Sequence, residues 1–330
     1  MSFQGNAGDL FQENEAYQHA GILLYDSVAG SRQATRSILF NLGFREINMV
    51  ADLAVFEEEL DSDGYDLVIA DLTDQISEVN NLVSRVRRSE LGGNPFQVIV
   101  LTSFELDSAG LMQALNSGAD DLLIRPLSTG MIQKRVKTLV EARKDFVVTS
   151  EYIGPDRRAD PDRPNSAELV KVPNSLKDRI IDGPQSAQKT AEKITKMREK
   201  VAEDHLHSLA VRLGVEAHCF TNAEVGSEKA IVARDTLEQL ALDISNRVGP
   251  TREQASSMVK MLANVLAGTQ KVHPDRQAEL IHQLALGVGV ALTADGDEAA
   301  ITAEIEATVE KVNNRVGWAE TSAKKSSSAA

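Results

Sequence analysis

The chain has 330 residues, of which 42% are hydrophobic and 25% are charged, a composition typical of globular proteins. No apolar run approaches the roughly 18 residues that span a bilayer. The N-terminus lacks the basic start and apolar core of a signal peptide. The single cysteine, Cys219, excludes an internal disulfide framework. We therefore expect a cytoplasmic protein that has no membrane partner.

Acidic residues outnumber basic ones along the whole chain, which carries a net charge of −14. Residues 1–150 hold 12 Lys and Arg against 22 Asp and Glu, residues 151–185 hold 6 against 7, and residues 186–330 hold 17 against 20. No third of the chain is basic, so most of the surface would repel a nucleic-acid duplex. The sequence therefore argues against nucleic acid as a partner.

After a polar stretch over residues 1–19, which we expect to be a flexible arm, residues 20–146 alternate short apolar runs with amphipathic stretches. The runs are continuously apolar, which indicates strands buried on both faces. Five strand–helix repeats predict an α/β domain, a doubly wound five-stranded parallel sheet covered by helices on both sides. Ser31 is the expected cap of the first helix. The expected strands are 21–25, 47–50, 67–70, 98–101 and 122–124, and the expected helices are 31–40, 53–60, 79–86, 111–115 and 127–142.

Prolines mark the next segment, residues 147–185, which holds five of the nine in the chain. The same segment mixes charges without a period. We expect a linker or a partly ordered crossover there.

Residues 186–318 follow a helical period instead, with apolar residues three or four positions apart, as in Leu237, Leu240, Ala241, Ile244 and Val248. Five such stripes predict an all-α helical bundle. Only two of the chain's 14 aromatic residues lie beyond residue 184, so the core of the helical domain is thin. Bundles of this kind often bury their remaining apolar face against a partner or a second copy, so the predicted partners of this domain include a second copy of the chain. We expect residues 319–330 to be a disordered tail.

Polar residues follow four of the expected strands where each strand ends. Asp26 follows the first strand, Asp71 the third, Thr102 the fourth and Arg125 the fifth. The carboxyl ends of parallel strands converge on one crevice, where ligands of such sheets bind. Two carboxylates, a hydroxyl and a cation at one crevice are suited to phosphoryl transfer, with the carboxylates holding a hard cation such as Mg²⁺.

Four segments, in this order and at this spacing, give the chain a family resemblance. Residues 20–145 are similar to the receiver domain of bacterial two-component response regulators, the chemotaxis-type receiver with a flavodoxin-like fold. The segments that carry it are Gly21–Ser27, Tyr65–Leu72, Val98–Ser103 and Gly118–Pro126.

The resemblance implies a role for each residue of the crevice. Asp71 would accept a phosphoryl group from a histidine kinase or a phosphotransfer protein. Mg²⁺ would be held by Asp26, Asp71 and the backbone carbonyl of Thr73. Thr102 would hydrogen-bond the phosphoryl oxygens, and Arg125 would supply the positive charge.

Five positions depart from the receiver pattern. Tyr25 replaces the first of two adjacent acids, and Arg125 replaces a lysine. Arginine keeps the charge but not the compact ammonium. The residues after the acceptor are Asp74 and Gln75 rather than Met-Pro, and Leu122 replaces an aromatic residue on the fifth strand.

These features predict a response-regulator-type signalling protein, phosphorylated at Asp71, whose output is protein–protein contact with a downstream signalling protein through the helical domain. No catalytic motif and no basic recognition helix is recognisable in that domain, so we expect no enzymatic activity. One alternative is a phosphorylation-independent pseudo-receiver that serves as an adaptor or scaffold. Another is a receiver-linked phosphatase or a degenerate histidine-phosphotransfer-like bundle.

Overall fold

The computed structural model describes residues 16–62, 64–158, 168–249, 252–268, 274–293 and 297–310. The chain divides into two compact units, Met1–Ala202 and Glu203–Ala330. The boundary between the two units falls inside a long helix, α8 (Ala187–Asn222).

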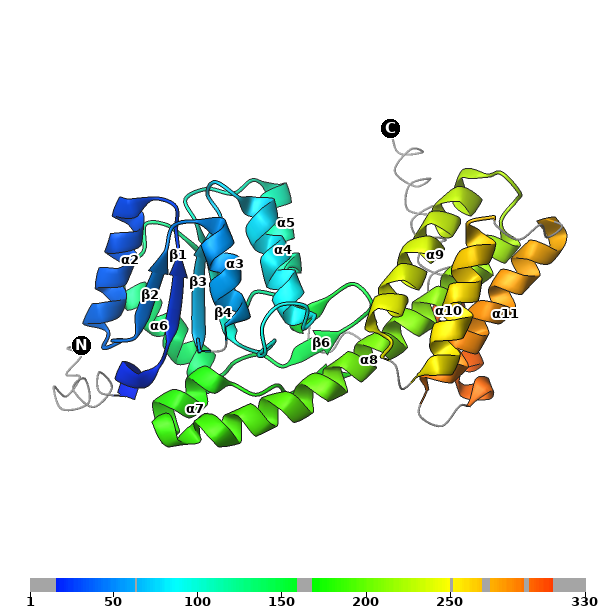
Figure 1. The fold of residues 1–330 in the computed structure, drawn as a ribbon. Helices are drawn as coiled ribbons and strands as arrows, with labels where there is room; N and C mark the ends of the chain where they lie inside the picture. The colour runs from blue at the N-terminus through cyan, green and yellow to red at the C-terminus, as the bar shows by residue number, and fades with distance from the viewer. Residues whose placement is uncertain are drawn as a thin grey trace, which may run out of the picture. The chain divides into compact units, whose positions relative to one another are not determined.

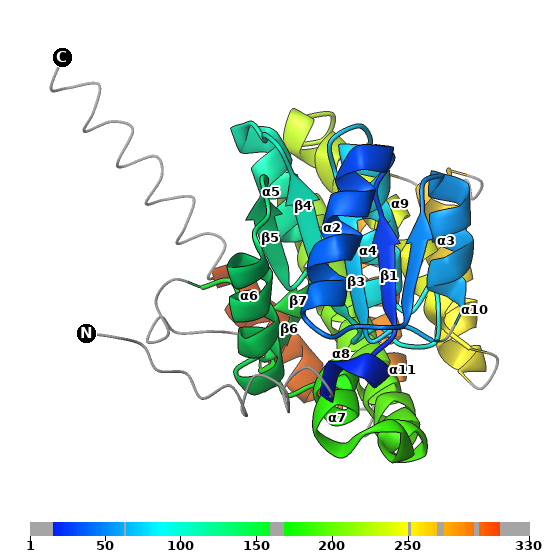
Figure 2. The same cartoon turned by 90° about the vertical axis from the view of Figure 1, so that its left-hand side faces the viewer.

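The first unit is built on a five-stranded sheet in the order β2-β1-β3-β4-β5. Figure 1 labels β2, β1, β3 and β4, and Figure 2 labels β5 beside β4. All neighbouring strands are parallel. This order is the flavodoxin-like form of the doubly wound fold, in which the switch point lies between β1 and β3. The fold class expected from the sequence is thus confirmed. The strands are β1 (Ile22–Tyr25), β2 (Ile47–Val50), β3 (Leu67–Asp71), β4 (Val98–Ser103) and β5 (Asp121–Ile124).

Helices cover both faces of this sheet, as Figure 2 shows. Successive side chains of a strand point to opposite faces, so Leu24 packs into one core and Leu23 into the other. The first core contains residues of α2 and α6, and the second contains residues of α3, α4 and α5. The helices are α2 (Ala29–Asn41), α3 (Leu53–Asp61), α4 (Ile76–Arg87), α5 (Ser108–Asn116) and α6 (Thr129–Glu141).

The start of α2 differs from the sequence prediction. Ser31 lies inside the first turn of α2 and does not cap it, because the helix already begins at Ala29. The Asp26 carboxylate accepts a hydrogen bond of 2.9 Å from the backbone N–H of Val28, just before the helix. A residue of the candidate site therefore also binds the backbone at the helix entrance.

The end of the expected N-terminal arm packs on the first unit. Tyr17, in the 3-10 turn η1 (Tyr17–His19), is buried and stacks on Phe44 with ring centroids 4.9 Å apart. The rest of the expected arm, residues 1–15, lies outside the described residues.

The proline-rich segment contains regular structure. Three short strands form an antiparallel sheet in the order β7-β6-β8. Phe146, Val148, Ile153 and Val170 of this sheet share a small core with Phe96. The helix α7 (Ser175–Asp182) and the first part of α8 follow. The strands are β6 (Phe146–Val148), β7 (Ile153–Pro155) and β8 (Leu169–Val170).

The second unit is helical, as the sequence predicts. It comprises the rest of α8, then α9 (Glu228–Arg247), α10 (Glu253–Leu266), α11 (Pro274–Leu292) and a helical stretch over residues 298–310. Its main core consists of the apolar stripes of these helices, with Leu237, Leu262 and Ile281 fully buried. Residues 311–330, which include the expected tail, lie outside the described residues. Among the helices that the structure describes, none has the length and apolarity to cross a membrane.

Candidate functional site

The structure brings the four crevice residues together at the carboxyl end of the sheet. Asp71 is the last residue of β3, and Thr102 lies directly opposite it on β4. Asp26 and Arg125 are the residues that follow β1 and β5. All four are buried, with 8% or less of each residue exposed.

Arg125 lies between the two carboxylates and binds both. Its Nε donates to Asp71 Oδ2 and its Nη2 to Asp26 Oδ2, each at 2.8 Å. Nη2 also donates to Thr102 Oγ1 at 3.1 Å, and the Thr102 hydroxyl in turn donates to Asp71 Oδ2 at 2.8 Å. The guanidinium thus holds three segments of the chain at the crevice through charge-assisted hydrogen bonds.

The remaining carboxylate oxygens are bound to the backbone. Asp71 Oδ1 accepts from the N–H of Thr73 at 3.0 Å, and Asp26 Oδ1 accepts from the N–H of Val28 at 2.9 Å. Each of the four carboxylate oxygens therefore already has a hydrogen-bond donor supplied by the chain itself.

This arrangement does not fit Mg²⁺. The ion requires nearly octahedral oxygen ligands at about 2.0–2.1 Å, whereas the guanidinium of Arg125 occupies the space between Asp26 and Asp71. A divalent cation at the same oxygens would meet both the positive charge and the N–H groups that now bind them. Nor do three or more metal-ligating His, Cys, Asp or Glu side chains cluster anywhere in the described ranges.

Tyr25, which stands where the receiver pattern has its first acid, is a packing residue. Its ring stacks on Phe56 with centroids 4.8 Å apart, and its hydroxyl donates to Gln75 Oε1 at 2.7 Å. Burial raises the pKa of the Tyr25 phenol, and the negative charges of Asp74, Asp52, Asp71 and Asp26 raise it further. The phenol stays neutral, so it does not replace the missing carboxylate as a cation ligand.

Two further residues contact Arg125 and were not identified in the sequence. Thr35 Oγ1, on α2, accepts from Arg125 Nη1 at 3.1 Å. Phe104 is half exposed, and the guanidinium carbon of Arg125 lies 5.6 Å from the centroid of its ring. No spacing or motif links these positions to residue 125, so only the fold reveals them.

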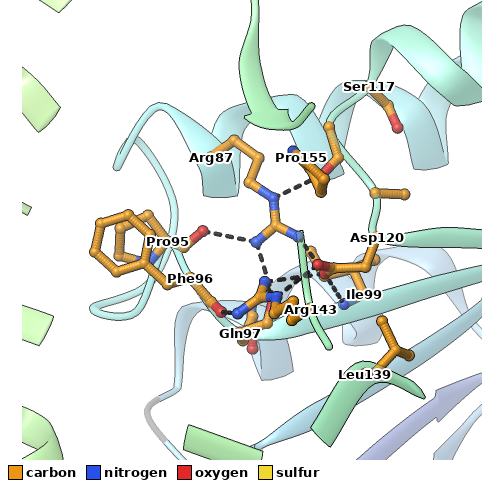
Figure 3. Close-up of polar contacts among 12 residues, drawn as sticks. Arg87, Pro95, Phe96, Gln97, Ile99, Ser117, Asp120, Leu139, Arg143 and Pro155 are labelled. Carbon is orange, nitrogen blue, oxygen red and sulfur yellow. Dashed lines mark hydrogen bonds and ion pairs between the residues drawn. The ribbon is translucent and has the colours of Figure 1, made fainter. Parts of the chain in front are cut away.

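A second buried charge cluster lies in the same unit and is drawn in Figure 3. Here one acid, Asp120, lies between two arginines. Its Oδ2 accepts from Arg87 Nη2 at 2.9 Å, and its Oδ1 accepts from Arg143 Nε at 2.7 Å. Asp120 also accepts from the N–H of Ile99 on β4, at 2.8 Å. The three charged side chains are at most 6% exposed.

Arg87 uses its other donors on backbone carbonyls of Pro95, Gln97 and Gly118. Phe146 of β6 packs against both arginines, with the guanidinium carbons 5.3 and 5.1 Å from its ring centroid. Burial lowers the pKa of Arg87 to about 10, and Asp120 opposes that shift. This cluster joins the sheet to the small β6-β7-β8 sheet.

Comparisons with solved structures find receiver domains. A signal receiver domain from Clostridium thermocellum is 20% identical and covers 37% of this chain and 98% of its own length, with a TM-score of 0.33. The chemotaxis protein CheY4 of Vibrio cholerae, also 20% identical, covers 36% of this chain and 96% of its own length, with a TM-score of 0.32.

Comparisons of sequence give a different and more distant likeness. No family model matches the chain. Thermosome subunit alpha of Methanothermobacter thermautotrophicus is 24% identical over 186 residues, and subunit beta of the same organism is 25% identical over 173 residues. The matches cover 56% and 52% of this chain but only 30% and 31% of those subunits. The chain thus spans about a third of the length of these relatives.

The sheet order and the acidic crevice define the class of the first unit. Five parallel strands in the order 2-1-3-4-5 form a domain with a flavodoxin-like fold. Buried acids lie at the carboxyl ends of its first and third strands, and a helical unit follows it along the chain. In this domain, an arginine binds the carboxylates that the resemblance assigns to a metal ion and to a phosphoryl group.

Proposed function

We propose that the chain is a response-regulator-type signalling protein whose receiver-like unit acts without phosphoryl transfer at Asp71. It would be the pseudo-receiver adaptor that the sequence offers as an alternative, with output through protein–protein contacts. The observation that carries this proposal is the position of Arg125, whose guanidinium binds Asp26 and Asp71 at once.

Two properties of the crevice support the proposal. The Asp71 side chain is only 4% exposed, and both its oxygens accept hydrogen bonds, so attack on an incoming phosphoryl group would first require these bonds to break. An internal cation also supplies the charge balance that a receiver otherwise takes from its metal. The crevice therefore has the properties of a structural centre rather than of a reactive one.

The test is exposure to small phosphodonors. The full chain is incubated with Mg²⁺ and acetyl phosphate, and separately with Mg²⁺ and beryllofluoride, and is followed by intact mass and by NMR. We expect no added phosphoryl group and no shifts around Asp71. A phosphoryl adduct that disappears in Asp71→Ala would refute the proposal and favour the phosphorylated response regulator.

Arg125→Lys is the matched comparison variant. This variant replaces the broad guanidinium by the compact ammonium of lysine, which has fewer donors. The change should free carboxylate oxygens of Asp26 and Asp71 for Mg²⁺. We expect this variant to bind Mg²⁺ more tightly than the natural chain does, as measured by Mg²⁺-dependent NMR shifts. Equal Mg²⁺ affinity in the two proteins would show that Arg125 is not what keeps the metal out.

Other expectations from the sequence stay predictions. The cytoplasmic location, a histidine kinase or phosphotransfer protein as partner, and a homodimer through the helical unit are among them. Sedimentation of the full chain would decide the last of these.

A further inference from the structure

Lysine is distributed unevenly along the chain. Residues 1–133 contain none, whereas six of the chain's 15 lysines lie within residues 171–200. This window holds eight Lys and Arg against four Asp and Glu, in a protein whose net charge is −14. The segment that follows β8 is therefore a basic region in an acidic chain.

Five of these lysines line one groove of about 560 Å³ in the first unit. Lys193, Lys196 and Lys200 come from α8, at spacings of three and four residues that place them on one face of the helix. Lys177 comes from α7, and Lys171 follows β8. Three separate segments thus converge on the groove.

The floor of the groove is apolar. Val172, Pro173 and Met197 line it and are half-buried, whereas the five lysines are exposed. An apolar floor between cationic side chains offers both contact area and charge to a ligand. Methionine adapts its shape to different apolar groups, which makes it common at peptide-binding surfaces.

The charge of the groove is largely unpaired. Lys193 donates to Asp178 at 2.9 Å, and Asp178 also accepts from Thr190. In the part of the chain that the structure describes, the other four lysines form no ion pair. The positive charges of the clustered lysines repel one another, and an anionic partner would relieve this repulsion on binding.

We propose that this groove binds an acidic peptide segment of a partner protein that also presents apolar side chains. Carboxylates of the segment would pair with the lysines, and its apolar side chains would contact Val172, Pro173 and Met197. The proposal does not rest on the state of the Asp71 crevice, so either proposal can fail alone.

The size of the basic patch favours a peptide over a nucleic acid or a membrane. Lys193 and Lys200 are about 10 Å apart along α8, which is short compared with a nucleic-acid or bilayer surface. A long polyanion would also be repelled by the net charge of −14 that the chain carries as a whole. Neither Phe, Tyr nor Trp is among the residues that line the groove, so it has no platform on which bases stack.

The probe is a short fluorescein-labelled peptide of Asp, Glu and Leu, titrated with the full chain and followed by fluorescence anisotropy. We expect saturable binding that weakens with added salt. Lys196→Glu/Lys200→Glu should lower the affinity at least about tenfold. Carbodiimide cross-linking with mass spectrometry should place the peptide on the groove lysines.

The matched control is Lys134→Glu/Lys137→Glu, which reverses the same number of charges on exposed positions of α6. It should change the affinity by less than about twofold, because any long-range effect of net charge is equal in the two variants. A peptide without leucine should bind more weakly. Asp71→Ala should bind like the natural chain.

Three results would overturn the proposal. The first is equal binding by the groove variant and the α6 control. The second is equal binding of the peptide without leucine, which would leave the apolar floor without a role. The third is tighter binding, through the same lysines, of single-stranded DNA or of phosphatidylglycerol vesicles.

Discussion

The two buried charge clusters of the first unit are opposites in composition. At the carboxyl end of the sheet, one arginine, Arg125, binds two acids. Beside β6, one acid, Asp120, binds two arginines. Both clusters are nearly inaccessible to water, and both join segments far apart in the chain.

The difference lies in what each cluster can do without its central residue. Without Arg125, the acids would keep neutral donors: the backbone N–H groups of Val28 and Thr73 bind Asp26 and Asp71, and the Thr102 hydroxyl also binds Asp71. Without Asp120, Arg87 would keep only neutral backbone carbonyls among the described residues, and no acid there would balance its charge. The cluster at Asp120 therefore depends more strongly on its central residue, because a buried guanidinium needs a counter-charge.

The largest effect is expected from Asp120→Ala. It leaves two buried guanidinium groups without a counter-charge, which should lower the free energy of unfolding by about 3–5 kcal/mol. Urea unfolding followed by circular dichroism measures it. Arg85→Ala, which removes an ion pair with Glu57 at the surface, is the control and should cost less than about 1 kcal/mol. Equal effects of the two variants would show that the buried cluster is unimportant for stability.

A smaller effect is expected from Arg125→Met. The substitution keeps much of the side-chain volume but removes the cation between Asp26 and Asp71, which should cost about 3 kcal/mol, the lower end of the range for breaking a buried ion pair. The cost should lie at this lower end because both acids keep backbone N–H donors. Urea unfolding followed by circular dichroism measures it. A loss below about 1 kcal/mol, as expected for a surface ion pair, would contradict the role assigned to the Arg125 charge.

The smallest effect concerns Asp66, a buried acid that pairs with Arg179. Burial raises its pKa, while Arg179, whose Nε lies 3.4 Å from its Oδ2, opposes the shift. Because the pKa is raised on folding, the stability that Asp66 contributes is complete below its unfolded pKa of about 4 and is lost as the pH rises through the folded pKa. The free energy of unfolding of the natural chain should therefore fall, relative to that of Asp66→Asn, as the pH rises from about 4 through the folded pKa of Asp66. Urea unfolding of both proteins at several pH values measures this difference. A difference that does not vary with pH would show that the protonation of Asp66 is not coupled to folding.

Much of the fold follows directly from the order of residues. Continuous apolar runs such as residues 22–25 and 67–70 are typical of strands inside a sheet that is covered on both faces. The polar residue after each run then has to lie at the carboxyl edge, which is why Asp26, Asp71, Thr102 and Arg125 could be predicted to meet. The helical period of the second half has the same local origin.

Other features depend on contacts between distant segments. The sequence placed Arg125 at the crevice, but only the structure shows its guanidinium between the two acids and within reach of Thr35, 90 residues away. The lysine groove likewise forms where three segments meet. Local periodicity determines which face of an element is buried, whereas the direction of a long charged side chain depends on partners that packing alone brings near.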